Sequence, residues 1–214
     1  MNNLDFNTNF SNIRELSGGR LIIVAGDEND LITGGEANDT LAGGRGSNFI
    51  DGRGGDDFLF TSFATPSEND ALSDTIIGGA GNDTIFAGGG DDLLVGASAT
   101  GTSTGEIDLL SGGSGGDTFV LGTAEQVFYL SDDNTDSIGI NDRAIIQSFN
   151  PNEDVIELNG SVEDYSLVEA LGSTFIFNEI GNGDIIGQVE GVTGLDLADA
   201  NFNFNGISTD SLIV

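Results

Sequence analysis

The chain has 214 residues, enough for one domain or one repeat array with a cap, and its 5 basic and 36 acidic residues give a formal net charge of −31. This charge excludes nucleic acid and an anionic membrane surface as partners, because both would repel the chain. Histidine and cysteine are absent, which excludes histidine-based catalytic triads, imidazole or thiolate zinc sites and disulfides. The chain is therefore either a disordered acidic polymer or a folded protein whose carboxylates bind a hard cation. Hydrophobic residues make up 37% of the chain and recur at fixed intervals, which favours order.

Residues 1–20 are expected to form an N-terminal cap segment. The start, 1–6, has neither a basic region nor an apolar stretch, so the sequence predicts no Sec-type signal peptide. No run of about 18 apolar residues occurs anywhere in the chain, and no membrane insertion is expected.

A nine-residue repeat follows, with the pattern G-G-x-G-x-D-x-U-x, where U is a large apolar residue. Four segments follow it closely: 34–42, 78–86, 87–95 and 112–120. Three looser copies keep the same register: 25–33, 43–51 and 52–60. The sixth position is occupied by Asp30, Asp39, Asn48, Asp57, Asp74, Asp83, Asp92, Asp108 and Asp117. The eighth position is always large and apolar: Ile32, Leu41, Ile50, Leu59, Ile76, Ile85, Leu94, Leu110 and Phe119. This regularity indicates a repeat architecture.

The motif resembles the RTX, or hemolysin-type, calcium-binding repeat, over about residues 21–130. The resemblance implies an all-β fold: a right-handed parallel β-roll followed by an antiparallel β cap. Each repeat supplies a six-residue turn and a three-residue strand, so two repeats complete one coil. The middle strand residue points inward. The resulting apolar core is thin and the glycines raise the entropy lost on folding, so several Ca²⁺ ions are expected to hold the roll together.

The expected calcium ligands lie in the turns. Glycines at positions 1, 2 and 4 permit positive φ angles that turn carbonyl oxygens toward one point, and the sixth-position carboxylate adds a charged oxygen. The glycines assigned to this role are Gly35, Gly44, Gly79, Gly81, Gly88, Gly90, Gly113 and Gly115. The family places each ion between successive turns on one edge, two repeats apart. One edge would then use Asp30, Asn48, Asp74, Asp92 and Asp117, and the other Asp39, Asp57, Asp83 and Asp108.

Three departures from the motif predict weaker sites. Asn48 is neutral, so sites that share it should bind less tightly. Loop insertions near 61–73 and 97–106 interrupt the repeat just before Asp74 and Asp108, which are expected to be partial ligands. For any single aspartate, the alternative role is a turn residue that accepts backbone N–H bonds.

Residues 131–214 lose the glycine period and are expected to form the antiparallel cap and a secretion-signal region. The expected strands are 144–149, 154–158, 165–169, 174–178 and 184–189. The segments 145–149 and 154–158 resemble the region that follows the repeats in RTX-type proteins. The last residues, 210–214, resemble a type I secretion signal, and an ordinary final strand is the alternative.

These features together predict a calcium-binding secreted or cell-surface module, structural or adhesive, or a type I secretion module, without enzymatic activity. A cell-surface, matrix or protein partner is expected in addition to Ca²⁺. Two alternatives stay open. An ice-binding β-roll would need a regular outward row of threonine. A non-catalytic C-terminal part of a secreted enzyme would carry its catalytic residues elsewhere, since this chain lacks the histidines of the H-E-x-x-H helix.

Overall fold

A computed structural model describes residues 2–5, 19–61, 71–98, 105–123, 126–130, 142–180 and 183–204. Most of the expected N-terminal cap segment, most of the loop insertions before Asp74 and Asp108, and the expected secretion signal at 210–214 lie outside the described residues.

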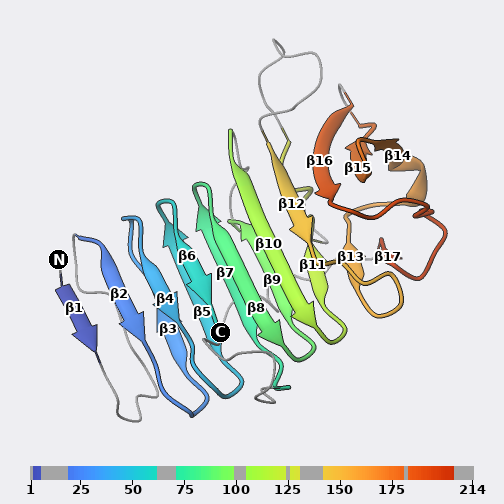
Figure 1. Ribbon diagram of the computed structural model, residues 1–214. Helices are drawn as coiled ribbons and strands as arrows, with labels where there is room; N and C mark the ends of the chain where they lie inside the picture. The colour runs from blue at the N-terminus through green and yellow to red at the C-terminus, as the bar shows by residue number, and fades with distance from the viewer. Residues whose placement is uncertain are drawn as a thin grey trace.

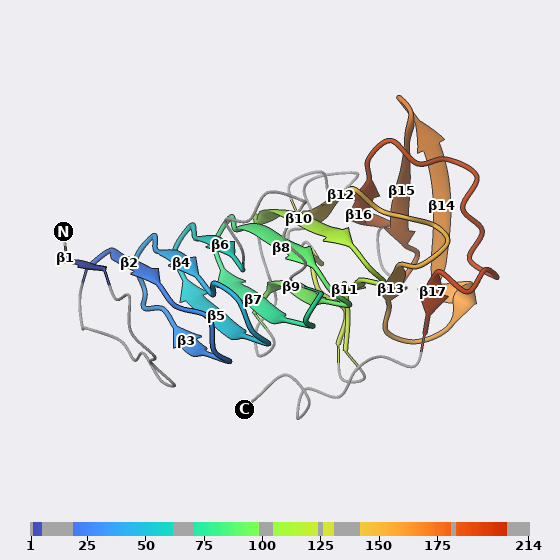
Figure 2. The same cartoon turned by 60° about the horizontal axis from the view of Figure 1, so that its bottom comes forward.

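The described strands form two sheets that lie face to face along an elongated molecule (Figures 1 and 2). The ten-stranded sheet contains, in spatial order, β1 (Asn2–Asp5), β2 (Leu21–Val24), β4 (Thr40–Ala42), β6 (Phe58–Phe60), β8 (Thr84–Gly89), β10 (Ile107–Ser114), β12 (Arg143–Gln147), β16 (Asp184–Val189), β15 (Ser173–Asn178) and β14 (Tyr165–Ala170). The seven-stranded sheet contains β17 (Phe202–Asn203), β13 (Val155–Glu157), β11 (Thr118–Val120), β9 (Leu93–Ala97), β7 (Thr75–Ala80), β5 (Phe49–Gly54) and β3 (Leu31–Thr33).

Successive repeats alternate between the two sheets, so two repeats make one coil, as the nine-residue period predicts. Within each sheet the neighbouring repeat strands are parallel; Leu41, for example, pairs with Leu59, which pairs with Ile85. The eighth-position residues of all nine repeats are fully buried between the sheets. The all-β fold class and the parallel roll are thereby confirmed, and the helical content of the described chain is the single 3-10 turn η1 (Val162–Asp164).

The parallel roll extends further than its glycine period. β12 pairs in parallel with β10, and β13 pairs in parallel with β11. β16 and β17 then continue the two sheets by pairing in parallel with β12 and β13. The expectation of antiparallel structure after residue 130 is therefore wrong for β12 and β13 and for the edge of β16 that faces β12, and β17 was not expected. The physical reason is that Ile146 and Ile156 align with the eighth-position residues Leu110 and Phe119, and all four are buried in the same core.

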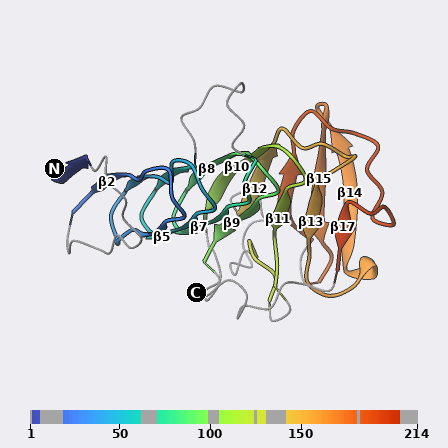
Figure 3. The same cartoon turned by 90° about the horizontal axis from the view of Figure 1, so that it is seen from below.

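The antiparallel part of the cap is smaller and consists of β14, β15 and β16. All five strands expected after residue 130 are present within a residue or two of their expected bounds. Figure 3 shows β14 and β15 at the far end of the molecule from the N-terminus. The cap therefore covers the last coil, with its antiparallel ribbon continuing the ten-stranded sheet.

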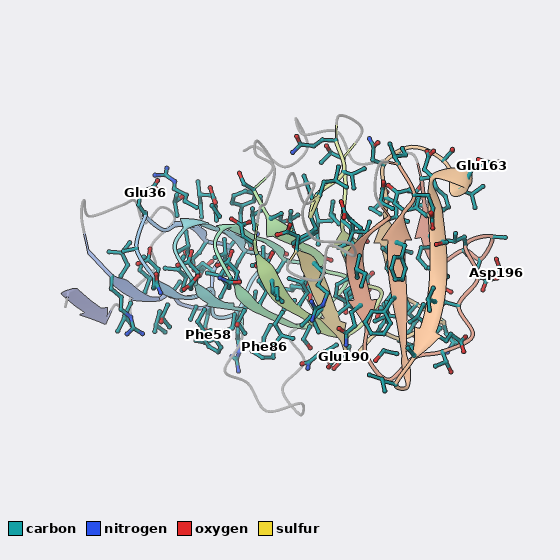
Figure 4. The ribbon with its side chains drawn as sticks, turned by 90° about the horizontal axis from the view of Figure 1, so that it is seen from above. Glu36, Phe58, Phe86, Glu163, Glu190 and Asp196 are labelled. Atoms are coloured by element: carbon teal, nitrogen blue, oxygen red, sulfur yellow. The ribbon has the colours of Figure 1, made fainter. Side chains whose placement is uncertain are left out.

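The outer surface of the roll is mixed in character. Phe58 and Phe86 lie side by side on neighbouring strands, with ring centroids 5.8 Å apart, and both are exposed (Figure 4). Outward threonines do not stack on one another in the repeats: Thr40 and Thr84 are separated by Phe58, and Thr75 lies between Phe49 and Leu93.

Candidate metal centres

The sixth-position side chains form two hydrogen-bonded ladders, one along each edge of the roll. On the first edge, the backbone N–H of Asp39 donates to Asp57 Oδ1 at 2.6 Å, and the N–H of Asp57 donates to Asp83 Oδ1 at 2.8 Å. The N–H of Asp83 donates in turn to Asp108 Oδ1 at 2.8 Å. This row is called the Asp39 edge below. Each carboxylate thus satisfies the backbone of the preceding turn, which fixes its orientation.

The second row, the Asp30 edge, follows the same rule. Each sixth-position N–H donates to the side-chain oxygen of the next member, at 2.6–3.1 Å, through Asp30, Asn48, Asp74, Asp92, Asp117 and Asp154. The nine expected members fall in the two rows that counting alternate repeats predicts, and Asp154 extends the second row by one member that was not expected. Asp74 and Asp108, which follow the insertions, keep their places in the ladders and are as buried as the others.

A second ladder, at position five, runs in the opposite direction and was not anticipated. The N–H of Asp56 donates to Asn38 Oδ1 at 3.1 Å, and the N–H of Asn82 donates to Asp56 Oδ1 at 2.9 Å. On the Asp30 edge the same bond joins Ser47 to Asn29. The signal is present in the sequence, because position five is asparagine, aspartate or serine in seven of the nine repeats.

The repeat glycines serve two separate purposes. Glycines at positions 2 and 4, other than Gly26 and Gly35, have positive φ, for example 113° at Gly79 and 120° at Gly81. Of the six other glycines assigned to this role, five also have positive φ: Gly44, Gly88, Gly90, Gly113 and Gly115. Gly35 does not have a positive φ, and Arg53, at position 2 of the repeat 52–60, adopts a left-handed φ of 73°.

Glycines at position 1 do not have positive φ, which corrects the expectation for this position. They are needed because a Cβ would collide with the sixth-position side chain and, at Gly34, Gly52 and Gly78, also with a carbonyl oxygen of the next turn. A Cβ on Gly34 would lie 2.9 Å from Asp39 Oδ2 and 2.5 Å from the carbonyl oxygen of Gly52. A Cβ on Gly78 would meet Asp83 Oδ2 and the carbonyl oxygen of Gly96.

This crowding places two acceptors around one point in successive turns. Two acceptors cannot hydrogen-bond to each other, and a hard cation satisfies both. At Asp57, Asp83 and Asp117 the second carboxylate oxygen, Oδ2, is buried and accepts no hydrogen bond from the described residues. Buried charged oxygens without a partner are costly. The donor set of carboxylate and carbonyl oxygens fits Ca²⁺, which accepts six to eight oxygens in flexible geometry.

The electrostatics of these groups agree with that fit. Burial, and then the charge of Asp108, raises the pKa of Asp83 to about 8. Burial also raises the pKa values of Asp57, Asp108 and Asp117 to about 7. The roll therefore holds its carboxylates where negative charge is unfavourable unless a cation or a proton compensates it.

At three other ladder positions the second oxygen has a protein donor. The N–H of Gly35 donates to Asp39 Oδ2 at 2.8 Å, and the N–H of Asn150 donates to Asp154 Oδ2 at 2.7 Å. At Asp108 the donor is the hydroxyl of Tyr129, 2.6 Å from Oδ2. Asp154 was missed from the sequence, although Asp154 followed by Ile156 repeats the spacing of positions six and eight.

Two negative findings bound the site. Nowhere in the part of the chain that the structure describes do three or more acidic side chains gather as a candidate metal cluster. A bound cation would therefore rely on backbone carbonyls as well as carboxylates. No helix of the described residues is long and apolar enough to cross a membrane.

The paired parallel sheets and the two carboxylate rows define the class of protein, a β-roll built from nonapeptide repeats. The family model of the RTX calcium-binding nonapeptide repeat matches residues 24–59 and 69–102, in four copies. The chain thus carries RTX repeats, and these repeats bind Ca²⁺, which confirms both predictions from the motif.

Other comparisons add little to this assignment. No curated protein matches the chain. Among solved structures, the chain is similar to the extracellular lipase LipA from Serratia marcescens, with 18% sequence identity and a TM-score of 0.33. That match covers 92% of this chain and 40% of the lipase chain, so the chain spans less than half of the lipase.

Proposed function

We propose that this chain is a non-enzymatic, calcium-loaded module of a secreted or cell-surface protein, which folds when several Ca²⁺ ions bind and then serves a structural or adhesive role or supports type I secretion. One observation carries the proposal. The buried Oδ2 atoms of Asp57, Asp83 and Asp117 each lack a hydrogen-bond donor among the described residues. In a chain with a net charge of −31, such groups make the closed roll unfavourable until cations neutralise them.

The chain's own residues prepare each site. Backbone N–H groups of the preceding turn hold Oδ1 of Asp57, Asp83 and Asp117, so that Oδ2 faces the interior of the turn. Because Gly52 and Gly78 carry no Cβ, Oδ2 of Asp57 or Asp83 and a carbonyl oxygen of the next turn approach the same point. At Gly112 the carboxylate of Asp117 alone lies there. Bound Ca²⁺ supplies the positive charge that this arrangement of acceptors lacks.

The sites are expected to differ in strength. Asn48 is neutral, and its Nδ2 donates to the carbonyl oxygen of Gly46 at 3.0 Å, so its side chain directs a donor into the turn. This supports a weaker site on the Asp30 edge around Asn48. Asp74 keeps the ladder geometry, with Oδ1 accepting from Asn48 N–H at 2.6 Å, which supports its inclusion as a ligand.

The export part of the proposal follows from mass action. Extracellular calcium modules have dissociation constants of about 10⁻⁴–10⁻³ M, far above cytosolic Ca²⁺. Empty sites would leave the acidic chain unfolded inside the cell, and external Ca²⁺ would fold it because the ion binds only the folded state. This order of events suits passage through a narrow exporter.

The alternatives are less well supported. Ice binding would need an unbroken row of outward threonines, whereas Phe58 lies between Thr40 and Thr84 on neighbouring strands. The family match is to a calcium-binding repeat and not to a catalytic family. A cell-surface, matrix or protein partner remains part of the proposal, and the exposed pair of Phe58 and Phe86 is one surface where it could be sought.

The test is a titration of the purified chain with Ca²⁺, followed by circular dichroism and by isothermal titration calorimetry, with Mg²⁺ as the control. Millimolar Ca²⁺ is expected to convert a largely disordered spectrum to a strand spectrum, with several ions bound per chain, whereas Mg²⁺ should have little effect because it demands near-ideal octahedral geometry. A chain that binds no Ca²⁺ would contradict the proposal.

A further inference from the structure

The Asp39 edge ends in a way that differs from its interior. Asp108 is fully buried, and its Oδ1 accepts the N–H of Asp83, as the ladder requires. Its Oδ2 accepts the hydroxyl of Tyr129 at 2.6 Å. At Asp57 and Asp83, earlier on the same edge, the corresponding Oδ2 has no such donor.

The hydroxyl stands where the next turn would otherwise present a carbonyl oxygen. A Cβ built on Gly34, Gly52 or Gly78 meets a carbonyl of the following turn, from Gly52, Gly78 and Gly96 respectively. A Cβ built on Gly96 meets the hydroxyl of Tyr129 and Asp108 Oδ2 instead. At Gly96, the fourth glycine of this series, the carbonyl acceptor of the next turn is therefore replaced by the hydroxyl donor of Tyr129.

Local structure fixes Tyr129 in this place. Tyr129 is fully buried and has a left-handed φ of 57°, a conformation that costs a bulky residue about 1–2 kcal/mol. The preceding hairpin holds it there through the bridge between Gly122 and Val127 and the bond from Phe128 N–H to the carbonyl of Leu121. Backbone strain retained at one residue, with its polar group aimed at a buried carboxylate, is typical of a functional position.

We propose that Tyr129 closes the Asp39 edge to calcium: its hydroxyl takes the place of an ion at Asp108, so the last Ca²⁺ on this edge is the one bound through Asp83. The hydroxyl lies beside Oδ2, where the other turns of this edge present the carbonyl oxygen of the next turn, so a proton donor replaces one of the oxygen ligands that a cation would use. The coil next to the cap is then closed without metal on this edge. This inference rests on the proposed calcium-binding function and specifies where the row of ions ends.

The test compares Asp108→Asn with Asp83→Asn by native mass spectrometry and calorimetry of the calcium-loaded chain. Asn at position 108 keeps an oxygen for the N–H of Asp83 and offers its amide to the oxygen of Tyr129. Asp108→Asn is expected to bind as many ions as the wild-type chain, and Asp83→Asn one ion fewer. Loss of an ion in Asp108→Asn would overturn the closure. A wild-type chain that binds no Ca²⁺ would instead contradict the proposed function.

A second measurement keeps the inference testable if Asp83→Asn fails to fold. Tyr129→Phe leaves the buried carboxylate of Asp108 without its donor, so its melting temperature in Ca²⁺ should fall. Adding Asp108→Asn to Tyr129→Phe removes the uncompensated charge and should restore part of that loss. If the two changes instead lower the melting temperature additively, the hydroxyl does not substitute for an ion at Asp108.

Discussion

The nonapeptide roll and the antiparallel cap are both β-structure, but different interactions stabilise them. In the roll, each strand contributes one fully buried eighth-position residue between the sheets, and the turns bury a carboxylate or amide in every repeat. In the cap, β15 and β16 bury several apolar side chains close together, among them Ile176, Ile186 and Val189. The roll thus depends on compensated charge, whereas the cap depends mainly on apolar burial.

The difference implies separate responses to solution conditions. Ca²⁺ and protons should control the roll, since both neutralise its buried carboxylates. The cap should respond far less to either, because its interior offers fewer such groups.

The first prediction concerns pH in the absence of calcium. The pKa of Asp83 is raised to about 8 and those of Asp57 and Asp117 to about 7, mainly by burial. A pKa raised in the folded state means that the calcium-free roll is most stable when these groups are protonated and loses stability as pH rises from about 4 toward 8. In EGTA, the strand signal in circular dichroism should therefore be larger at pH 5 than at pH 8.5.

Calcium should reverse the sign of this dependence. Ca²⁺ binds the ionised carboxylates, so lowering the pH from 8 to 5 should weaken its apparent affinity in calorimetry. A calcium-free chain that is better folded at pH 8.5 than at pH 5 would show that the buried carboxyls do not govern the roll.

The second prediction removes one ladder carboxylate. Asp83→Ala deletes a proposed ligand and leaves the buried N–H of Asp57 without its acceptor, so the free energy of unfolding in Ca²⁺ should fall by about 3 kcal/mol. Asp56→Ala is the matched control, because it removes the same charge from the exposed position-five ladder and should cost less than about 1 kcal/mol. Equal losses in thermal or urea unfolding would remove the distinction between the two ladders.

The third prediction concerns position 1. Gly78→Ala forces a Cβ to within 2.6 Å of the carbonyl oxygen of Gly96 and against the Asp83 carboxylate, and should cost about 2 kcal/mol. Gly26→Ala is the control, because a Cβ there meets nothing within 4 Å. That variant should be neutral or more stable by up to about 1 kcal/mol. The melting temperatures of both variants in Ca²⁺ are measured by calorimetry. A melting temperature of Gly78→Ala equal to that of the wild-type chain would refute the steric role of Gly78.

The smallest expected effect is at Arg53, which adopts a left-handed conformation where other repeats have glycine. Both Arg53→Gly and Arg53→Ala remove the positive charge. Glycine adopts the left-handed φ without a Cβ penalty, whereas alanine still pays that penalty. Arg53→Gly should therefore be more stable than Arg53→Ala by about 1 kcal/mol in urea unfolding. The reverse order would indicate that the left-handed φ of residue 53 carries no cost.

Sequence alone was sufficient for the repetitive features of the fold. The nine-residue spacing predicted the alternation between sheets, the buried column that includes Ile85 and Leu94, and every member of the two carboxylate rows except Asp154. These succeed because every repeat meets the same local environment, so one rule applies to all of them.

The features that sequence missed depend on non-repetitive contacts. Tyr129 reaches Asp108 from a hairpin outside the repeat, and no spacing rule connects them. Parallel pairing resumes at β12 and β13 after a gap of 37 residues between Asp117 and Asp154, which hides the period. The position-1 glycines were given the wrong reason, because their collision with the next turn's carbonyl exists only once the coils stack.

The most direct test of the account is hydrogen exchange of the intact chain, followed by mass spectrometry in Ca²⁺ and in EGTA at pH 7.5. In Ca²⁺, amides of β4 to β11 and of β15 and β16 should all be protected. In EGTA, protection should be lost across β4 to β11 and largely retained in β15 and β16. Equal protection of the repeat strands in both buffers would contradict the claim that calcium holds the roll together.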